Sequence, residues 1–423
     1  MQILVIGQGA REHAIVHSLL KDPGVQVVCA PGNPGIARIA RTVSVNPVDA
    51  GEVVELARQV AADLVVIGPE APLVAGVADA LRENGFKVFG PSAAAAKLEG
   101  SKEFAKQVMY EAGVATAQSS YCVTVEEART ALEKFGAPYV VKDDGLAAGK
   151  GVVVTDDFEI ALEHAFACID SRDGGAVVIE EFLSGPEISL FGISDGKTVF
   201  ALTPAQDFKR VGDGDTGANT GGMGAYSPLP WAPKNLTTEV TQKVLQPVIN
   251  EMAKRGTPFI GLLYAGLILT KSGVKVIEFN VRFGDPETQV VLARLDSSLS
   301  QLLNAAATGT LGHLPDLNWK DQAAVTVVMA AEGYPSKPKL GGQISGLEDA
   351  TSQGAQVFHA GTALDHAGNI VVNGGRVLAV TTIGNDLADA RRRAYQAIET
   401  IKFAGEHHRS DIALAAVKGE IVI

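Results

Sequence analysis

Four short apolar segments in the first 100 residues each end directly in a loop rich in glycine or proline. They cover residues 3–6, 25–29, 64–67 and 88–89. Helix-length stretches separate them, and short continuous apolar runs are typical of strands that are buried on both faces of a parallel sheet. Ligands bind such sheets at the carboxyl ends of the strands. The sequence therefore predicts an N-terminal parallel α/β domain with a ligand site along one edge of its sheet.

The chain is too long to fold around a single core. Its 423 residues favour two to four domains. After residue 100 the pattern changes to strands, glycine-rich turns and a hairpin at 261–281, and after about residue 320 it becomes rich in short strands. A helix is expected at 387–402 and a final strand at 419–423. We predict an α/β and α+β multidomain protein with domains at residues 1–100, 101–310 and 320–423, the last of them mixed and β-rich.

Charge and cysteine content argue against several classes of protein. Lys and Arg number 36 against 48 Asp and Glu, a net charge of −12, whereas a general nucleic-acid binder would carry a basic surface. The three cysteines lie far apart and form no C-x-x-C pair, which favours a reducing, cytoplasmic compartment. The most apolar stretch, 259–269, is about half the length needed to span a bilayer. No secretory signal is evident at the N-terminus. We expect a cytoplasmic protein that binds neither nucleic acid nor membrane.

The turn Gly7-Gln-Gly9 after the first strand begins like a dinucleotide-binding motif. Glu12 replaces the third glycine of that motif, which would prevent close helix packing and place a carboxylate near the pyrophosphate position. The helix N-terminus beside Arg11 would still suit a single phosphate. A tight turn without any ligand is the alternative.

A glycine-rich loop at residues 145–151 resembles a P-loop only at first sight. A Walker A motif needs four residues between its glycines and Ser or Thr after the lysine. Here three residues separate Gly145 from Gly149, and Gly151 follows Lys150. We expect a hairpin-like loop whose backbone amides cover phosphates, with Lys142 reaching in from the preceding strand. A flexible linker is the alternative.

Two other segments each allow two interpretations. Glu180 and Glu181 are adjacent near the end of an expected strand at 176–182, so one of them must point inward. That acid either hydrogen-bonds a nucleotide, at an adenine amino group or a ribose, or has no ligand role. Residues 212–224 form a long polar loop with many glycines, which predicts a lid or, alternatively, disorder.

The expected strand at 274–281 carries the most informative side chains. Because side chains alternate along a strand, Glu278, Asn280 and Arg282 share one face, and the apolar residues between them anchor the other. Carboxylate and amide oxygens suit Mg²⁺ beside phosphates, and a guanidinium suits a carboxylate or phosphate. Asp285 follows in the same stretch. This combination indicates an ATP-dependent ligase.

Long motifs along the whole chain carry a resemblance to a known family. They include GQGAREHA, IGPEAPLVAG, KDDGLAAGKGVVV, QDFKRVGDGDTGANTGGMGAYSP and VIEFNVRFGDPETQ. The chain resembles the ATP-grasp ligases and, among them, the glycinamide ribonucleotide synthetases of purine biosynthesis. The resemblance implies a pre-ATP-grasp N-terminal domain, an ATP-grasp domain with a mobile lid subdomain at about 120–187, and a C-terminal domain.

The resemblance also implies a reaction. ATP would drive the ligation of glycine to 5-phosphoribosylamine through glycyl phosphate, with Mg²⁺ or Mn²⁺, giving glycinamide ribonucleotide, ADP and phosphate. We expect small-molecule partners only, and a monomer or weak dimer. The alternatives are an ATP-grasp ligase of another acid and amine, a nucleotide sensor without activity, and a dinucleotide oxidoreductase based on Gly7 and Gly9 alone.

Particular residues acquire roles by the same resemblance. ATP would contact Lys102, Lys142, Gly145, Gly149, Lys150, Gly151, Glu180, Phe182, Leu183 and Glu187. The metal would be bound by Glu278 and Asn280. The substrates would be surrounded by Gly9, Arg11, Glu12, Asn33, Pro69 and Glu70. The catalytic group would comprise Arg282, Asp285, Lys209 and Asp207.

Two positions depart from the family pattern. Asp143 stands where a small residue is usual, and strand alternation predicts that it points away from Lys142. Phe208 stands where Tyr or His is expected, which argues against a polar role at that position. Residues 260–270 contain no acid, so a metal would depend on Glu278, Asn280, water and ATP itself.

Overall fold

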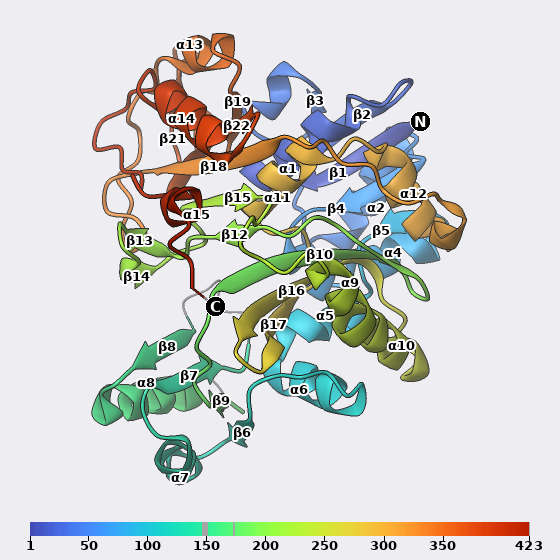
Figure 1. Ribbon diagram of the computed structural model, residues 1–423. Helices are drawn as coiled ribbons and strands as arrows, with labels where there is room; N and C mark the ends of the chain where they lie inside the picture. Colours follow the sequence, from blue (N-terminus) through green and yellow to red (C-terminus); the bar gives the residue numbers. More distant parts are fainter. Residues whose placement is uncertain (146–150, 172–173, 423) are drawn as a thin grey trace.

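The computed structural model describes residues 1–145, 151–171 and 174–422 (Figure 1). Its first 100 residues form a five-stranded sheet of order β3-β2-β1-β4-β5, in which every pair is parallel. The strands are β1 Gln2–Gly7, β2 Gln26–Pro31, β3 Arg41–Thr42, β4 Leu64–Ile67 and β5 Val88–Phe89. The intervening helices are α1 Ala10–Leu19, α2 Ala50–Gln59, α3 Glu70–Val74, α4 Val77–Glu83 and α5 Ala93–Gly100. The predicted parallel sheet is confirmed, and only the two-residue β3 was not foreseen.

The described middle of the chain contains two four-stranded antiparallel sheets. The one with the longer strands has the order β11-β10-β16-β17, with β10 Glu187–Asp195, β11 Val199–Ala201, β16 Ile260–Thr270 and β17 Gly273–Asn280. The predicted hairpin is the β16–β17 pair. Helices of this region are α6 Lys102–Glu111, α9 Leu236–Val240, the π-helix η2 Thr241–Leu245, α10 Gln246–Lys254, α11 Glu287–Arg294 and α12 Leu299–Thr308.

A smaller four-stranded sheet stands apart from the rest, at the bottom of Figure 1. Its order is β6-β9-β7-β8, with β6 Ser119–Cys122, β7 Tyr139–Asp143, β8 Val152–Thr155 and β9 Val177–Glu180. Helices α7 Val125–Phe135 and α8 Phe158–Asp170 pack on it and share with it a core separate from the larger clusters. A unit with its own core can move as a body, and the lid subdomain expected at about 120–187 stays a prediction.

The C-terminal sheet takes strands from both sides of the predicted boundary near residue 320. Its order is β12-β15-β18-β22-β19. Strands β18 Ala323–Ala330, β19 Gln356–His359 and β22 Arg376–Gly384 belong to the C-terminal part, whereas β12 Gln206–Asp207 and β15 Gly224–Ser227 come from the middle of the chain. Other elements here are β20 Thr362–Leu364, β21 Ile370–Val372, α13 Leu347–Ser352 and α14 Leu387–Ile398. Backbone hydrogen bonds therefore join the middle of the chain to the C-terminal part.

The final strand expected at 419–423 is wrong for residues 419–422, where the structure shows no strand. Among the described residues, helix α15 Leu414–Lys418 is the last regular element, and Gly419 ends it in the left-handed conformation at φ +71°. Val422 is 83% exposed, so its apolar side chain is not covered by a sheet face. An apolar residue pattern at a chain end predicts a strand only where a partner edge is present.

The glycine-rich segment at 212–224 is an ordered hairpin and not an irregular loop. Strands β13 Arg210–Gly212 and β14 Thr216–Asn219 pair antiparallel. Arg409 from the C-terminal part, 1% exposed, places Nη1 2.7 Å from Asp215 Oδ1 and lies 4.9 Å above the Phe208 ring. The Ser410 N–H donates to Asp213 Oδ1 at 2.8 Å. The anchors are about 200 residues away in sequence, which is why the local pattern suggested a free loop.

Among the described residues, no helix combines the length and the apolar character needed to cross a bilayer.

Arg409→Ala should loosen the β13–β14 hairpin. Removing the buried guanidinium takes an ion-pair partner from Asp215 and Asp411 and a cation from the Phe208 ring, at a cost of about 2 kcal/mol in unfolding free energy. Hydrogen exchange at residues 210–219 should speed up in this variant. The control is Arg392→Ala, whose exposed side chain pairs only within α14. Equal exchange in the two variants would contradict this anchoring role.

Candidate active site

Arg282 joins the end of β17 to the N-terminal sheet. Its Nε lies 3.3 Å from Glu70 Oε2 at the start of α3, and its Nη2 lies 3.1 Å from Glu99 Oε1 on α5. Nη2 also donates to Asn280 Oδ1 at 3.3 Å, as alternation along the strand predicts. Burial would lower the pKa of Arg282, but Glu99 and Glu70 outweigh it and raise the pKa. The guanidinium is therefore held charged at the boundary of two domains.

Glu278 lies near several cations. Burial would raise its pKa, yet Lys209, Lys142 and Lys102 outweigh burial and hold the pKa below its ordinary value. Lys142 and Lys209 also pair with Glu180 and Glu187, so several lysines gather here with carboxylates between them, an arrangement that can bind an anionic ligand such as a polyphosphate. Among the described residues, no group of three or more His, Cys, Asp or Glu is placed to hold a metal. The oxygens of Glu278 and Asn280 fit a hard cation that brings further oxygen ligands with it.

Glu180 binds two lysines at the base of the lid. Lys142 Nζ on β7 lies 2.9 Å from Glu180 Oε2, and Lys106 Nζ on α6 lies 2.9 Å from Glu180 Oε1. Lys142 also donates to the Ile277 carbonyl at 3.1 Å. Glu180 is 4% exposed, whereas Glu181 is half-buried and pairs with Lys275. The prediction that one of the adjacent acids points inward is confirmed.

Hydrogen bonds join the start of the glycine-rich loop to the N-terminus of α6. Asp144 Oδ1 accepts the Lys102 backbone N–H at 2.6 Å, and Lys102 Nζ donates to the Gly145 carbonyl at 3.2 Å. Lys102 is thus placed between the loop and β17, since Glu278 also acts on its pKa. Gly149 and Lys150 lie outside the described residues, and the outward orientation expected for Asp143 stays a prediction.

Glu12 occupies the space where a dinucleotide would place its pyrophosphate. Its Oε2 accepts the Gly9 N–H at 2.6 Å, and its Oε1 lies 2.6 Å from Arg11 Nε. A Cβ at Gly68 would come within 2.2 Å of Glu12 Oε1, so the carboxylate fills the gap between the ends of β1 and β4. The helix N-terminus is already capped by an anion of the protein itself. The dinucleotide interpretation therefore fails on geometry.

The remaining residues of the predicted substrate group meet the other domains. Arg11 Nη1 donates to the Phe283 carbonyl at 3.2 Å. This contact brings the turn at residues 7–9, called the first turn below, beside the segment that contains Arg282. Asn33 donates to the carbonyls of Gln8 and His359 at 2.8 Å each, so its amide bridges the N-terminal and C-terminal parts. Pro69 precedes α3 as its N-cap, directly before Glu70.

Lys209, Asp207 and Glu187 form a second charged group beside the β10 edge. Lys209 Nζ lies 2.5 Å from Glu187 Oε2. Burial raises the pKa of Asp207 to about 7, with Lys209 opposing and Glu287 reinforcing the shift. The Glu287 carboxylate is 2% exposed and accepts hydrogen bonds from Tyr264 Oη at 2.6 Å and from a serine hydroxyl. Of the two predicted nucleotide contacts after β9, Phe182 is exposed and Leu183 half-buried.

Asp285 lies between the first turn and the C-terminal part. It accepts hydrogen bonds from Gln289 Nε2 at 2.7 Å and from Arg376 Nη2 at 3.1 Å. Its Oδ2 lies 3.9 Å from the position that a Cβ on Gly9 would take. The structure thus brings Arg11 and Glu70 of the predicted substrate group, and Lys209 and Asp207 of the catalytic group, close to residues 278–287. Asn33 instead contacts the carbonyls of Gln8 and His359.

Sequence reasoning missed several residues that this cluster contains. They are Glu99, Lys106, Ser189, Tyr264, Glu287 and Arg376. Lys106 had a local signal, because it follows Lys102 by one helical turn on the same face of α6. Glu287 lies within the motif VIEFNVRFGDPETQ. The partners of Glu99, Glu287 and Arg376 are remote in sequence, so no local pattern indicated what these residues contact.

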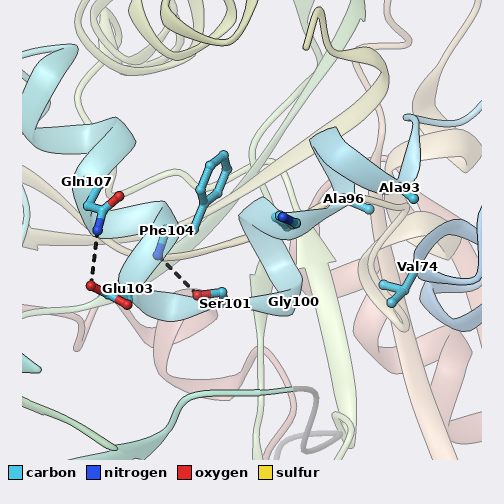
Figure 2. A pocket seen from close by; sticks show the side chains of 9 residues that line it. Val74, Ala93, Ala96, Gly100, Ser101, Glu103, Phe104 and Gln107 are labelled. Atoms are coloured by element: carbon cyan, nitrogen blue, oxygen red, sulfur yellow. Dashed lines mark hydrogen bonds between the residues drawn. The ribbon is translucent and has the colours of Figure 1, made fainter. Parts of the chain in front are cut away.

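A pocket of about 390 Å³ lies beside this cluster and not within it (Figure 2). Its walls come from α3, α5 and α6, with Val74, Ala96 and Phe104 among them. Ser101 adjoins Lys102, but none of the predicted site residues lines the pocket. We therefore place the candidate active site at residues 278–287 and not in this pocket.

Comparison with known proteins decides the family. Models of phosphoribosylglycinamide synthetase match the chain in three parts, the N domain at residues 1–99, the ATP-grasp (A) domain at 100–288 and the C domain at 324–415. A phosphoribosylamine–glycine ligase of Streptomyces coelicolor is 60% identical over 421 residues, which cover 98% of this chain and 99% of that relative. The chain belongs to the phosphoribosylglycinamide synthetase family.

Other members and solved structures agree with this assignment. A phosphoribosylamine–glycine ligase of Mycobacterium leprae is 53% identical over 429 residues, with both chains fully covered. The crystal structure of a phosphoribosylamine–glycine ligase from Thermotoga maritima has a TM-score of 0.86 at 34% identity, covering 98% of this chain and 100% of that chain. The predicted multidomain fold class is confirmed.

More distant structures share the fold alone. The biotin carboxylase domain of the Hydrogenobacter thermophilus 2-oxoglutarate carboxylase, solved with MgADP, ADP and bicarbonate, has a TM-score of 0.73 at 19% identity. It covers 96% of this chain, and the match covers 91% of that domain.

Glu180→Gln should weaken ATP binding. An amide cannot neutralise Lys106 and Lys142 together, so both lysines would move from positions that the buried carboxylate holds, and affinity should fall by about tenfold or more. Isothermal titration with ATP measures the change. Glu181→Gln is the matched control, because the adjacent acid is half-buried and pairs with Lys275. Equal affinities for the two variants would contradict the role given to Glu180.

Proposed function

We propose that this protein joins glycine to 5-phosphoribosylamine at the expense of ATP, giving glycinamide ribonucleotide, ADP and phosphate. The observation that carries this function is full-length membership in a family whose relatives are phosphoribosylamine–glycine ligases. The lysines around Glu278, together with the contact that brings Arg11 against residue 283, fit a reaction that brings ATP and two small substrates together.

ATP would lie between the lid and the β16–β17 hairpin. Lys102 and Lys142 would contact its phosphates, because both act on Glu278 and both adjoin the glycine-rich loop. The ends of the loop, Gly145 and Gly151, would let its backbone approach the phosphates. The predicted adenine and ribose contacts are Glu180, Phe182, Leu183 and Glu187. Since Glu180 binds two lysines, its main role would be to hold Lys142 in place for the ATP phosphates.

A divalent cation, Mg²⁺ or Mn²⁺, would be held by Glu278 and Asn280. It would supply neutralisation of charge on the phosphate oxygens. The hydrogen bond from Arg282 to Asn280 keeps the amide oxygen on the side of the strand that Glu278 shares. The two oxygens then face the lysines that would bind the same phosphates.

The proposed reaction depends on positioning the substrates and neutralising the phosphate charge, and it needs no covalent bond to the protein. The carboxylate of glycine attacks the γ-phosphorus of ATP, giving glycyl phosphate and ADP. The amine of phosphoribosylamine then attacks the glycyl carbonyl carbon and expels phosphate, which leaves the amide. The permanently charged Arg282 would hold the carboxylate of glycine. Lys209, paired with Glu187, would stabilise the phosphate that leaves.

Two aspartates have environments suited to different tasks. Burial raises the pKa of Asp207 to about 7, near the value at which a general base is effective, so Asp207 would accept the proton of the attacking amine. Burial would also raise the pKa of Asp285, but Arg376 and Arg11 outweigh it and keep Asp285 ionised. Asp285 would then accept a hydrogen bond from a substrate amine.

Phosphoribosylamine would bind along the carboxyl edge of the N-terminal sheet. Gly9 and Arg11 lie beside the Arg282 segment, and Glu12 orients Arg11. Pro69 and Glu70 would form the opposite wall. Asn33 would act by holding the first turn against His359, since its amide is already bonded to main-chain carbonyls.

Purified protein with ATP and Mg²⁺ should release ADP only when glycine and freshly generated phosphoribosylamine are both present. A coupled ADP assay, with mass spectrometry of the amide product, measures this. A larger signal with alanine or bicarbonate than with glycine would contradict the choice of acid. ATP binding without any ADP release would indicate a nucleotide sensor.

Glu278→Ala should reduce turnover by about 10³-fold or more with the fold intact, because the proposed metal loses its carboxylate ligand. The Mg²⁺ concentration needed for half-maximal rate should rise in parallel. Lys271→Ala, at the exposed turn of the same hairpin, is the control and should behave as the wild type. Near-normal turnover of Glu278→Ala would refute the metal assignment.

A further inference from the structure

A single guanidinium from the C-terminal part binds four acceptors at the candidate active site. Arg376 Nη1 donates to the carbonyls of Gly221 and Asp285 at 2.5 Å each and to the Gly222 carbonyl at 3.5 Å, and Nη2 lies 3.1 Å from Asp285 Oδ2. The Arg376 side chain is 22% exposed, so most of its length is covered by protein. One side chain therefore fixes both the main chain and the carboxylate of Asp285.

The turn at Gly221 and Gly222 is shaped to receive this guanidinium. A Cβ at Gly221 would lie 3.0 Å from Arg376 Cζ, so a larger residue there would push the guanidinium away. Gly222 has φ +110°, and a Cβ there would lie 2.4 Å from Pro286 Cδ. The Gly221 N–H donates to Tyr334 Oη at 3.0 Å, and the Gly221 carbonyl accepts from Arg376. The C-terminal part therefore binds Gly221 through both its N–H and its carbonyl. The two glycines are thus required by close approach of Arg376 and Pro286.

The strand that carries Arg376 is a rigid support. Arg376 is the first residue of β22, which lies between β18 and β19 in the C-terminal sheet. Strand β15, which begins two residues after Gly222, pairs with β18 in the same sheet. Figure 1 shows β15, β18 and β22 lying together above the hairpin of the middle domain. The glycine turn and Arg376 are therefore held in register by one set of backbone hydrogen bonds.

Asp285 needs such support because it carries negative charge next to the first turn. The groups that face it are Arg376, Arg11, Arg282 and the amide of Gln289. Among these, Arg376 forms an ion pair with the Asp285 carboxylate and also donates to the Asp285 carbonyl. A guanidinium can do both at once because its donors lie in a planar fork, whereas an ammonium is a single point charge.

We propose that Arg376 is a positioning residue of the ligation, supplied by the C-terminal domain, that holds the Asp285 carboxylate and the Gly221–Gly222 turn against the bound amine substrate. The inference rests on the proposed function and adds a residue that does not touch the reacting atoms. It also means that the C-terminal domain helps to position the reacting groups, through the side chain of Arg376.

The test compares Arg376→Ala, Arg376→Lys and the wild type in the ADP-release assay, with each substrate varied in turn. For Arg376→Ala, kcat/KM for phosphoribosylamine should fall by about 100-fold, as expected when a reacting group is displaced, and the KM for ATP should stay at the wild-type value. Arg376→Lys should keep part of the activity, because lysine retains the positive charge but lacks the planar set of donors of a guanidinium. Guanidinium at low, non-denaturing concentration should restore activity to Arg376→Ala and not to Arg376→Lys.

The pH profile provides a second readout. Arg376 lowers the pKa of Asp285, so its loss should raise that pKa, and the decline of kcat/KM on the acid side should begin at a higher pH in Arg376→Ala than in the wild type. Arg392→Ala, an exposed arginine of α14 in the same domain, should leave the profile unchanged.

Three results would overturn the inference. Wild-type values of kcat/KM and an unchanged pH profile in Arg376→Ala would show that the ion pair has no part in the reaction. An equal loss for ATP, glycine and phosphoribosylamine, without rescue by guanidinium, would show a general effect on folding. If the wild type itself releases no ADP with glycine, the proposed function fails first, and the inference fails with it.

Discussion

The ion pairs of Arg282 with Glu70 and Glu99 hold the N-terminal sheet against the hairpin that carries the proposed metal ligands. The Arg282 side chain is 18% exposed, so loss of either carboxylate would leave a largely desolvated charge without a full set of partners. This contact places the carboxyl ends of β1 and β4 beside residues 278–287. The proposed substrate and nucleotide sites adjoin because the two domains meet here, and the hydrogen bond from Arg11 to the Phe283 carbonyl adds a second contact.

Charge balance explains much of the arrangement around that contact. Several cations surround Glu278, and one of them, Lys142, also pairs with Glu180, which binds Lys106 as well. Like charges in a partly buried site repel each other, so the lysines favour a polyphosphate that would neutralise them. At the opposite side Glu12 caps the first helix with a carboxylate of the protein, which leaves Arg11 as the group that faces the next domain.

The C-terminal domain is part of the site through its sheet and two arginines. Arg409 covers Phe208, which stands between Asp207 and Lys209, and Arg376 holds Asp285. The aromatic ring of Phe208 forms a cation–π contact with the Arg409 guanidinium. The side chains of its sequence neighbours, Asp207 and Lys209, belong to the proposed site. The departure from the family's usual Tyr or His is therefore compatible with positioning of the proposed catalytic loop.

The sequence by itself determined the local elements, the inward orientation of Glu180, and the shared side of Asn280 and Arg282, because side-chain periodicity and turn residues act over a few positions. It also determined the family, through long motifs. Only the tertiary structure decided that β12 and β15 join the C-terminal sheet, that residues 212–224 are an anchored hairpin, and that Arg376 meets Asp285. These pairings join segments about 90 to 200 residues apart, and they depend on how whole domains pack, which no local pattern encodes.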